Sequence, residues 1–311
     1  MSHLLVLAAS LLLSSGVLRD YDRSSSSVGP VLSRGWDATA VERLRSDLPG
    51  IVARVATRLD RQFETPMTTV LTPDVVEFRR VVRELTHGRD VSDNVVGVAI
   101  PTLHVLVIRG GLSPGALHSF AETLRHEIAH LLIHQIAGVG TRVPRWFDEG
   151  LASWASEHRL PPWDEADLVV LARVGGLYDL LALEKEFPPG HRGTSIAYTQ
   201  SYLLVAFLVE CHGERAILDV LASLEHRELR EALSELTGET VGDLEMHFSS
   251  WLISRRALFW SLLGFVNLWT VAALLAIVAI VRSVLRRRRL LRTLEDEERD
   301  HGLSDPSEPV V

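Results

Sequence analysis

The chain has 311 residues, of which 47% are hydrophobic and seven are tryptophan, and this composition excludes an intrinsically disordered chain in favour of one with a sizeable core. Its formal net charge of −8 argues against a nucleic-acid partner, because such partners are bound by clustered Lys and Arg. Cys211 is the only cysteine, so no disulfide can form within the chain.

Residues 1–17 have the features of a signal peptide. The run from Leu4 to Leu13 is apolar over about ten residues, which matches a signal-peptide core and is too short to cross a bilayer. Ser14 and Gly16 are the small residues that a cleavage site needs, although no basic residue precedes the run. The alternative is a short buried helix, but the serine-rich segment at residues 24–27 favours export.

Residues 18–94 are expected to form the N-terminal α/β portion of the ectodomain. The helical spacing of residues 37–63 is interrupted by Pro49-Gly50, so we expect a broken helix or two short ones. A strand is expected at residues 67–72 and a helix at residues 73–85.

A second domain is expected at residues 95–254. Two strands around Pro101 open it, and a long helix follows. Ser113 is a good N-cap for this helix, Pro114 fits its first position, and Gly138 is a natural stop. Beyond Gly138 the pattern is mainly helical. We therefore expect an α+β fold, in which a small sheet precedes a long helix and a mostly helical C-terminal part.

The long helix carries the sequence His-Glu-Ile-Ala-His at residues 126–130. Side chains four residues apart on a helix point the same way, so His126 and His130 can bind one metal ion. Glu127 lies beside them and can act as general base on a metal-activated water, which is the mechanical reason for the H-E-x-x-H spacing. A catalytic zinc site also needs a third protein ligand and one open position.

Downstream residues must supply the third ligand. His134 continues the stripe but lies two turns from His126, a rise of about 12 Å, which is too far for one tetrahedral site. Ile136 stands where the metzincin class needs a histidine, and this excludes that class. Glu149 remains, near the start of a second helix, and its neighbour Asp148 is a rival.

The pairing of HEIAH at residues 126–130 with PRWFDEGLA at residues 144–152 resembles the peptidase MA-like branch of the thermolysin-type zinc peptidases, the gluzincins. The resemblance extends over about residues 95–252. It implies a zincin-like peptidase domain, a Zn²⁺ cofactor and a peptide or protein substrate, with Glu149 of the EGLA element as third ligand. Asp148 would then orient a ligand rather than bind the ion.

A downstream tyrosine stabilises the oxyanion in many gluzincins. Tyr198 and Tyr202 are candidates for this role, because residues four apart share a helix face. We favour Tyr198, and the alternative is that both are packing residues. A cysteine-peptidase mechanism has no support, because Cys211-His212 are adjacent and diverge on a helix. We also expect one of the strands before the long helix to align an extended substrate by edge pairing, and we favour Leu103 to Ile108.

A transmembrane helix is expected at residues 257–281, which carry no charge and exceed the ~20 apolar residues that cross a bilayer. An arginine run begins directly after it, at Arg282. The positive-inside rule therefore places the tail, residues 282–311, in the cytoplasm and the large N-terminal portion outside the cell membrane. A signal peptide at residues 1–17 demands the same orientation.

Two rival functions can be weighed on the sequence. A membrane-tethered interaction module could keep the zincin fold without turnover, but the presence of Glu127 favours a metalloprotease, and thus a hydrolase. An intramembrane zinc protease needs its motif inside a membrane span. Glu122 and Arg125 lie on the same helix as the motif, so this helix belongs to a soluble domain.

Overall fold

The computed structural model describes residues 16–92, 95–110 and 117–302, with the backbone alone at residues 117–119, 255–268 and 288–302. The predicted N-cap Ser113, the following Pro114 and residues 1–15 of the predicted signal peptide lie outside the described residues. The chain divides into two compact units, residues 1–252 and 253–311.

The first unit contains a mixed five-stranded sheet with the order β1-β2-β3-β5-β4. β1 and β2 form an antiparallel hairpin, β3 runs parallel to both β2 and β5, and β4 is antiparallel to β5. The strands are β1 (Asp22–Ser26), β2 (Gly29–Ser33), β3 (Thr68–Thr72), β4 (Gly97–Ile100) and β5 (Val105–Arg109), with 3-10 turns η1 (Gly16–Leu18) and η2 (Pro101–Leu103).

The strands predicted at residues 67–72 and on either side of Pro101 are confirmed, while the β1–β2 hairpin was not predicted. Its first strand is serine-rich and mostly exposed, so it lacks the apolar alternation that identifies a strand. The expected edge pairing along Leu103 to Ile108 is wrong. β5 is hydrogen-bonded on both sides, by β3 and β4, and the sheet edge is therefore β4.

Helix α3 (Val75–Leu85) covers one face of the sheet. Asp74 caps its start by accepting a hydrogen bond from the Glu77 amide, and buried apolar side chains of α3 pack with Val105 and Val107 of β5. Because side chains alternate along a strand, the buried Ile108 points to the opposite face, where a β-carbon on Gly97 would touch it.

Helix α2 (Ala38–Arg58) continues through Pro49, so the predicted break is wrong. A proline inside a helix removes one backbone hydrogen bond and costs about 3 kcal/mol. On either side of Pro49 the helix buries Leu44, Leu48 and Val52, and each such side chain contributes about 1.5–3 kcal/mol when fully buried. Tertiary packing therefore outweighs the local preference.

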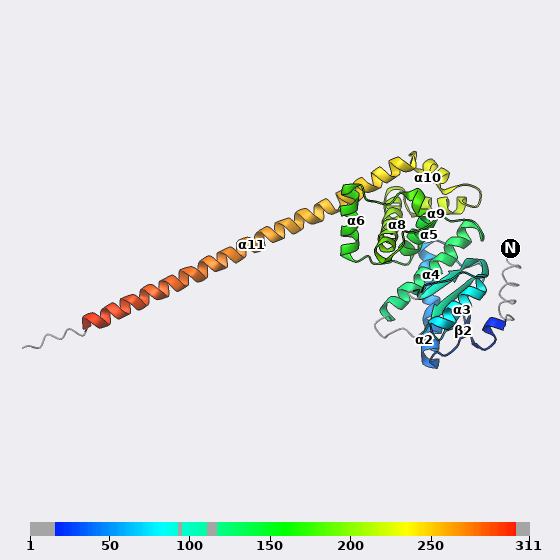
Figure 1. Ribbon diagram of the computed structural model, residues 1–311, viewed down its shortest axis with the longest axis horizontal. Helices are drawn as coiled ribbons and strands as arrows, with labels where there is room; N and C mark the ends of the chain where they lie inside the picture. The colour runs from blue at the N-terminus through cyan, green and yellow to red at the C-terminus, as the bar shows by residue number, and fades with distance from the viewer. Residues whose placement is uncertain (1–15, 93–94, 111–116, 303–311) are drawn as a thin grey trace, which may run out of the picture. The chain divides into compact units, whose positions relative to one another are not determined.

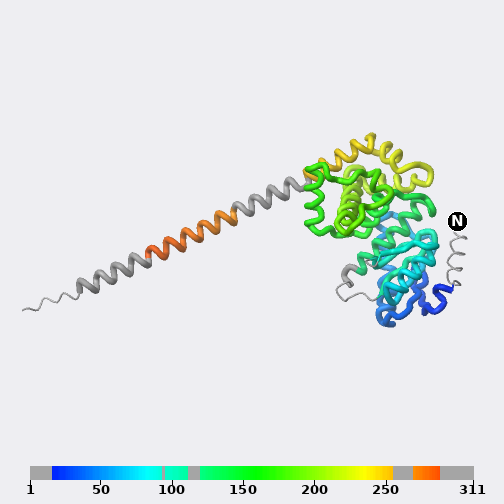
Figure 2. The backbone as a smooth tube through the Cα atoms, viewed as in Figure 1, coloured from blue at the N-terminus to red at the C-terminus, as the bar shows by residue number. Residues whose placement is uncertain are grey.

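Helix α4 (Leu117–Ala137) lies between the sheet and the helices that follow it (Figure 1). It ends, as predicted, before Gly138, whose φ of 91° suits glycine. Figure 2 shows the same division as blue and cyan segments on one side of α4 and green and yellow ones on the other. The later helices are α5 (Arg145–Ala155), α6 (Pro162–Val174), α7 (Leu180–Leu183), α8 (His191–His212), α9 (Glu214–Ser223), α10 (Leu229–Thr237) and α11 (Val241–Gly302). The predicted α+β fold with a mostly helical C-terminal part is confirmed.

The second unit contains most of α11, a helix of 62 residues. Within its described part, Trp269–Arg287 is long and apolar enough to cross a membrane, with a mean hydropathy of 1.8. This segment overlaps the predicted span at residues 257–281 and begins later. The side chains of residues 257–268 lie outside the described part. One candidate membrane helix near the C-terminus is thus confirmed.

Helices α5 and α8 pack together at Gly150. A β-carbon there would lie 2.5 Å from the Ser201 carbonyl oxygen and 2.7 Å from the Val205 side chain, so only glycine allows this approach. On α5, Trp146 and Phe147 are buried, and the helix is held firmly by its packing. The two acidic residues that follow, at positions 148 and 149, are fixed with it.

Replacing Gly150 with alanine should lower the free energy of unfolding by roughly 1–3 kcal/mol, because the added methyl meets backbone that has no room to move. Thermal unfolding of the purified protein measures this loss. Gly50→Ala is the matched control, since a β-carbon at Gly50 of α2 meets nothing within 4 Å and alanine is the better helix former by about 1 kcal/mol. Equal stability of the two variants would contradict the packing argument.

Candidate metal centre

Three side chains from α4 and α5 converge on one point. His126 and His130 stand one turn apart on α4, and their Nε2 atoms are 3.1 Å apart. Glu149 of α5 places its Oε2 3.3 Å from His126 Nε2 and 3.5 Å from His130 Nε2. Their potential ligand atoms all lie within 4.8 Å of one another. The structure thus brings the three sequence-predicted ligands together.

These separations fit a tetrahedral zinc site. Bonds of about 2.0–2.1 Å at tetrahedral angles place the donor atoms about 3.3–3.4 Å apart, close to the 3.1, 3.3 and 3.5 Å found here. Two imidazole nitrogens with one carboxylate oxygen form a donor set that catalytic zinc uses, and three protein donors leave the fourth position open. The residues present therefore fit the metal that the motif implies.

Asp148 lies behind the histidines rather than between them. Its Oδ1 is 2.8 Å from His130 Nδ1, and its Oδ2 is 3.3 Å from His134 Nε2. A hydrogen bond donated by Nδ1–H leaves the Nε2 lone pair of His130 free for a metal ion. The two rival candidates for third ligand, Asp148 and His134, are thus hydrogen-bonded to each other and lie outside the group formed by His126, His130 and Glu149.

The pKa values follow from this packing of charge. Burial disfavours the charged form of His130, but Asp148 and Glu149 outweigh it and raise the pKa of His130 well above its usual value. Burial is likewise outweighed by the histidines, which lower the pKa of Asp148 to about 2 and also lower that of Glu149. Both carboxylates are therefore ionised at neutral pH and present negative charge to a cation.

Glu127 faces the outer edge of β4. Its Oε2 accepts a hydrogen bond of 2.8 Å from the Ala99 amide. A β-carbon on Gly97 would lie 2.9 Å from Glu127 Cγ, so the glycine leaves room for this carboxylate. Sequence reasoning missed Gly97 and Ala99, because no local pattern reveals which strand lies beside the helix.

Tyr198 of α8 reaches the group, and Tyr202 lies against His158. The Tyr198 hydroxyl donates to Glu149 Oε1 over 3.3 Å. Burial and then the charge of Glu149 raise the pKa of Tyr198, so its hydroxyl stays protonated and remains a donor at neutral pH. Tyr202 lies edge-on to His158, with 6.2 Å between the ring centres.

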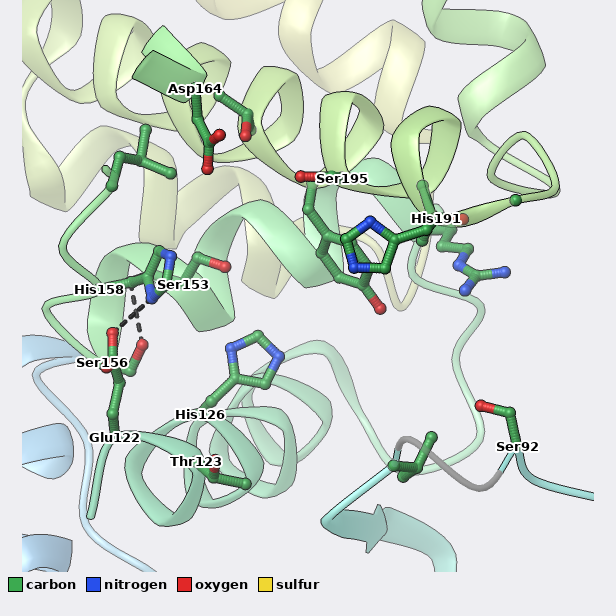
Figure 3. Close-up of a pocket in the computed structure, with 17 residues that line it drawn as sticks. Ser92, Glu122, Thr123, His126, Ser153, Ser156, His158, Asp164, His191 and Ser195 are labelled. Carbon is green, nitrogen blue, oxygen red and sulfur yellow. Dashed lines mark hydrogen bonds and ion pairs between the residues drawn. The ribbon is translucent and has the colours of Figure 1, made fainter. Parts of the chain in front are cut away.

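A pocket of about 840 Å³ opens beside His126. Figure 3 shows Glu122 and His158 on one side of His126, joined by a hydrogen bond, and His191 on the other. Asp164 lies on the same side as Glu122 in this view. Of the three candidate ligands, His126 lines this pocket.

Several lining residues were missed by sequence reasoning. Glu122 lies one helical turn before His126, and Arg145 lies one turn before Glu149, so the i, i+4 rule could have found both. His158 and Asp164 follow α5 in the chain and carry no such signal, because only the tertiary fold brings them to the pocket.

A comparison with protein families matches residues 91–254 to the Peptidase MA superfamily. The chain belongs to this superfamily. The match spans β4, β5 and the helices from α4 to α10, and so includes every residue of the candidate centre. No curated protein matches the chain. Membership in the Peptidase MA superfamily and the candidate membrane helix together fit a membrane-anchored peptidase.

Proposed function

We propose that the chain is a membrane-anchored zinc metallopeptidase that hydrolyses peptide bonds. The observation that carries this proposal is the spacing of the three donor atoms of His126, His130 and Glu149, which suits tetrahedral zinc. These residues would hold the ion. A bound zinc ion would polarise the peptide carbonyl and lower the pKa of a water molecule toward ~7.

Glu127 acts as the general base in this mechanism. Its carboxylate takes a proton from the attacking water and then gives it to the leaving amine. The hydrogen bond from Ala99 and the space above Gly97 hold the carboxylate beside the pocket. The Tyr198 hydroxyl donates a hydrogen bond to Glu149 in the resting protein. We propose that it donates a hydrogen bond to the oxyanion of the substrate as the reaction proceeds.

The edge strand β4 is positioned to align the substrate. The Ala99 amide points away from β5 toward Glu127, so the outer edge of β4 borders the general base. An extended peptide pairing with this edge would bring its backbone past the three ligands. The strand that carries this role is thus β4 rather than the neighbouring segment from Leu103 to Ile108.

The helix at Trp269–Arg287 anchors the enzyme in this proposal. Under the positive-inside rule, Arg282 and the arginines that follow it favour a cytoplasmic tail at residues 282–311, with residues 18–255 outside the cell. Protease added to intact cells should therefore digest the outer portion and leave an epitope tag at Val311 intact. Digestion of the tag with protection of the outer portion would reverse the orientation.

Replacing Glu127 with glutamine should keep stoichiometric zinc but lower peptide hydrolysis by about 10²- to 10⁴-fold, the effect typical of a lost general base. Metal analysis and cleavage of a quenched-peptide library by full-length protein in detergent measure the two properties. Glu186→Gln, at an exposed site outside the pocket, is the control and should behave like wild type.

The competing function is a zincin-fold interaction module without turnover. A wild-type protein that holds zinc yet cleaves no peptide of the library in a Glu127-dependent way would favour that module and overturn the peptidase.

Glu149→Ala should abolish stoichiometric zinc, because it removes one of three ligands. Asp148→Asn should weaken zinc affinity by only about 10- to 100-fold, because Asp148 contacts the ion through His130. Dialysis against a graded series of chelator, followed by metal analysis, separates the two. Loss of zinc from Asp148→Asn with retention by Glu149→Ala would show that aspartate is the ligand and that the gluzincin assignment is wrong.

A further inference from the structure

Arg145 stands at the start of α5, one helical turn before Glu149, and lines the same pocket as His126 and Tyr198. Its guanidinium stacks on the ring of Phe187, with 4.6 Å from Cζ to the ring centre. Its positive charge also acts on Tyr198, whose hydroxyl donates a hydrogen bond to Glu149. Phe187 lies edge-on to Tyr198 at 5.0 Å. The ring of Phe187 therefore supports the Arg145 guanidinium at the wall of the pocket that His126 also lines.

No carboxylate among the described side chains pairs with Arg145, and its contacts are an aromatic face and a neutral hydroxyl. Arg125 of α4 differs from Arg145, because it donates a hydrogen bond to the Ser156 carbonyl. A guanidinium has five donors in a planar fork, and stacking on a ring leaves its edge free for a planar anion. Arg145 thus brings an uncompensated positive charge to the pocket wall.

The acidic lining residues lie elsewhere in the pocket. Figure 3 shows Glu122 to the lower left of His126 and Asp164 above it, and Glu122 is already paired with His158. Gly190, His191 and Thr194, which carry no negative charge, also line the pocket. Among the described residues that line the pocket, Arg145 is the one arginine, and no lysine is present.

We propose that Arg145 binds a carboxylate of the peptide substrate, one residue or so from the scissile bond, through a bidentate charge-assisted hydrogen bond. The carboxylate is either an acidic side chain or the free C-terminus, since both present the same pair of oxygens to the guanidinium. This inference rests on the proposed peptidase function of the same pocket. It makes Arg145 a residue that determines substrate specificity.

The test uses zinc-loaded, full-length protein in detergent with quenched peptides in matched pairs. One arm compares glutamate with glutamine at each position around the cleaved bond, and the other compares a free C-terminus with an amidated one. Wild-type protein should favour the carboxylate member of one arm by about 10- to 100-fold in kcat/KM, as expected for hydrogen bonds to a charged group. The arm in which the preference falls identifies the source of the carboxylate.

Arg145→Gln should reduce this preference to a ratio near 1, and Arg145→Lys, which keeps the charge without the fork, should retain part of it. Arg142→Gln is the matched control, because Arg142 is exposed and outside the pocket. Thermal unfolding verifies that the variants are folded. A wild-type ratio near 1, or an Arg145→Gln variant that loses activity equally on both members of each pair, would overturn the proposal in favour of a residue that only positions Tyr198.

A binding measurement distinguishes a failure of this inference from a failure of the proposed peptidase function. The same peptide pairs are titrated into zinc-loaded Glu127→Gln protein and its Arg145→Gln double variant, with fluorescence anisotropy as the readout. A carboxylate preference that depends on Arg145 would support the inference even if wild-type protein cleaves nothing, and equal binding of both members of every pair would overturn it even if cleavage is seen.

Discussion

The approach of α5 to α4 is the contact on which the candidate centre depends. Two imidazoles follow from the spacing of one helix, but the third donor arrives only because α5 is held between α4 and α8. Gly150 permits the close contact of α5 with α8, and it directly follows Glu149 in the chain. The packing of α5 against α8 at Gly150 therefore helps to position the neighbouring Glu149 carboxylate.

This packing concentrates charge in a place with little solvent. Asp148 and Glu149 stay ionised there because His130 and its neighbours hold them, and an unpaired charge in such a place is costly. A divalent cation bound here would balance the carboxylate charge in place of the proton on His130. Its binding would therefore be coupled to local stability. Glu127 borders the edge of β4, where it accepts a hydrogen bond from the Ala99 amide. The Tyr198 hydroxyl donates to Glu149 and is also affected by the charge of Arg145.

The sequence predicts the parts of the site that are local and leaves out those that are not. The HEIAH helix follows from i, i+4 geometry, whereas Glu149 enters only through a resemblance, because no spacing rule spans the loop between two helices. Pro49 predicts a break that packing overrides. The order of strands places β4, not β5, at the edge beside Glu127, and strand order is a property of the whole sheet rather than of either strand. The sequence places Arg145 one turn from Glu149, but only the tertiary structure shows that none of the described carboxylates pairs with it.

Membership in the Peptidase MA superfamily identifies the fold and the class of protein, and the geometry of three donors supports zinc as its metal. X-ray absorption at the zinc edge, measured on full-length protein loaded with one equivalent of zinc, tests this claim most directly. We expect two imidazole nitrogens at about 2.0–2.1 Å from zinc and two oxygens at about 2.0–2.2 Å, one from Glu149 and one from water. A spectrum with a sulfur ligand at about 2.3 Å, or with three or more imidazoles, would contradict it.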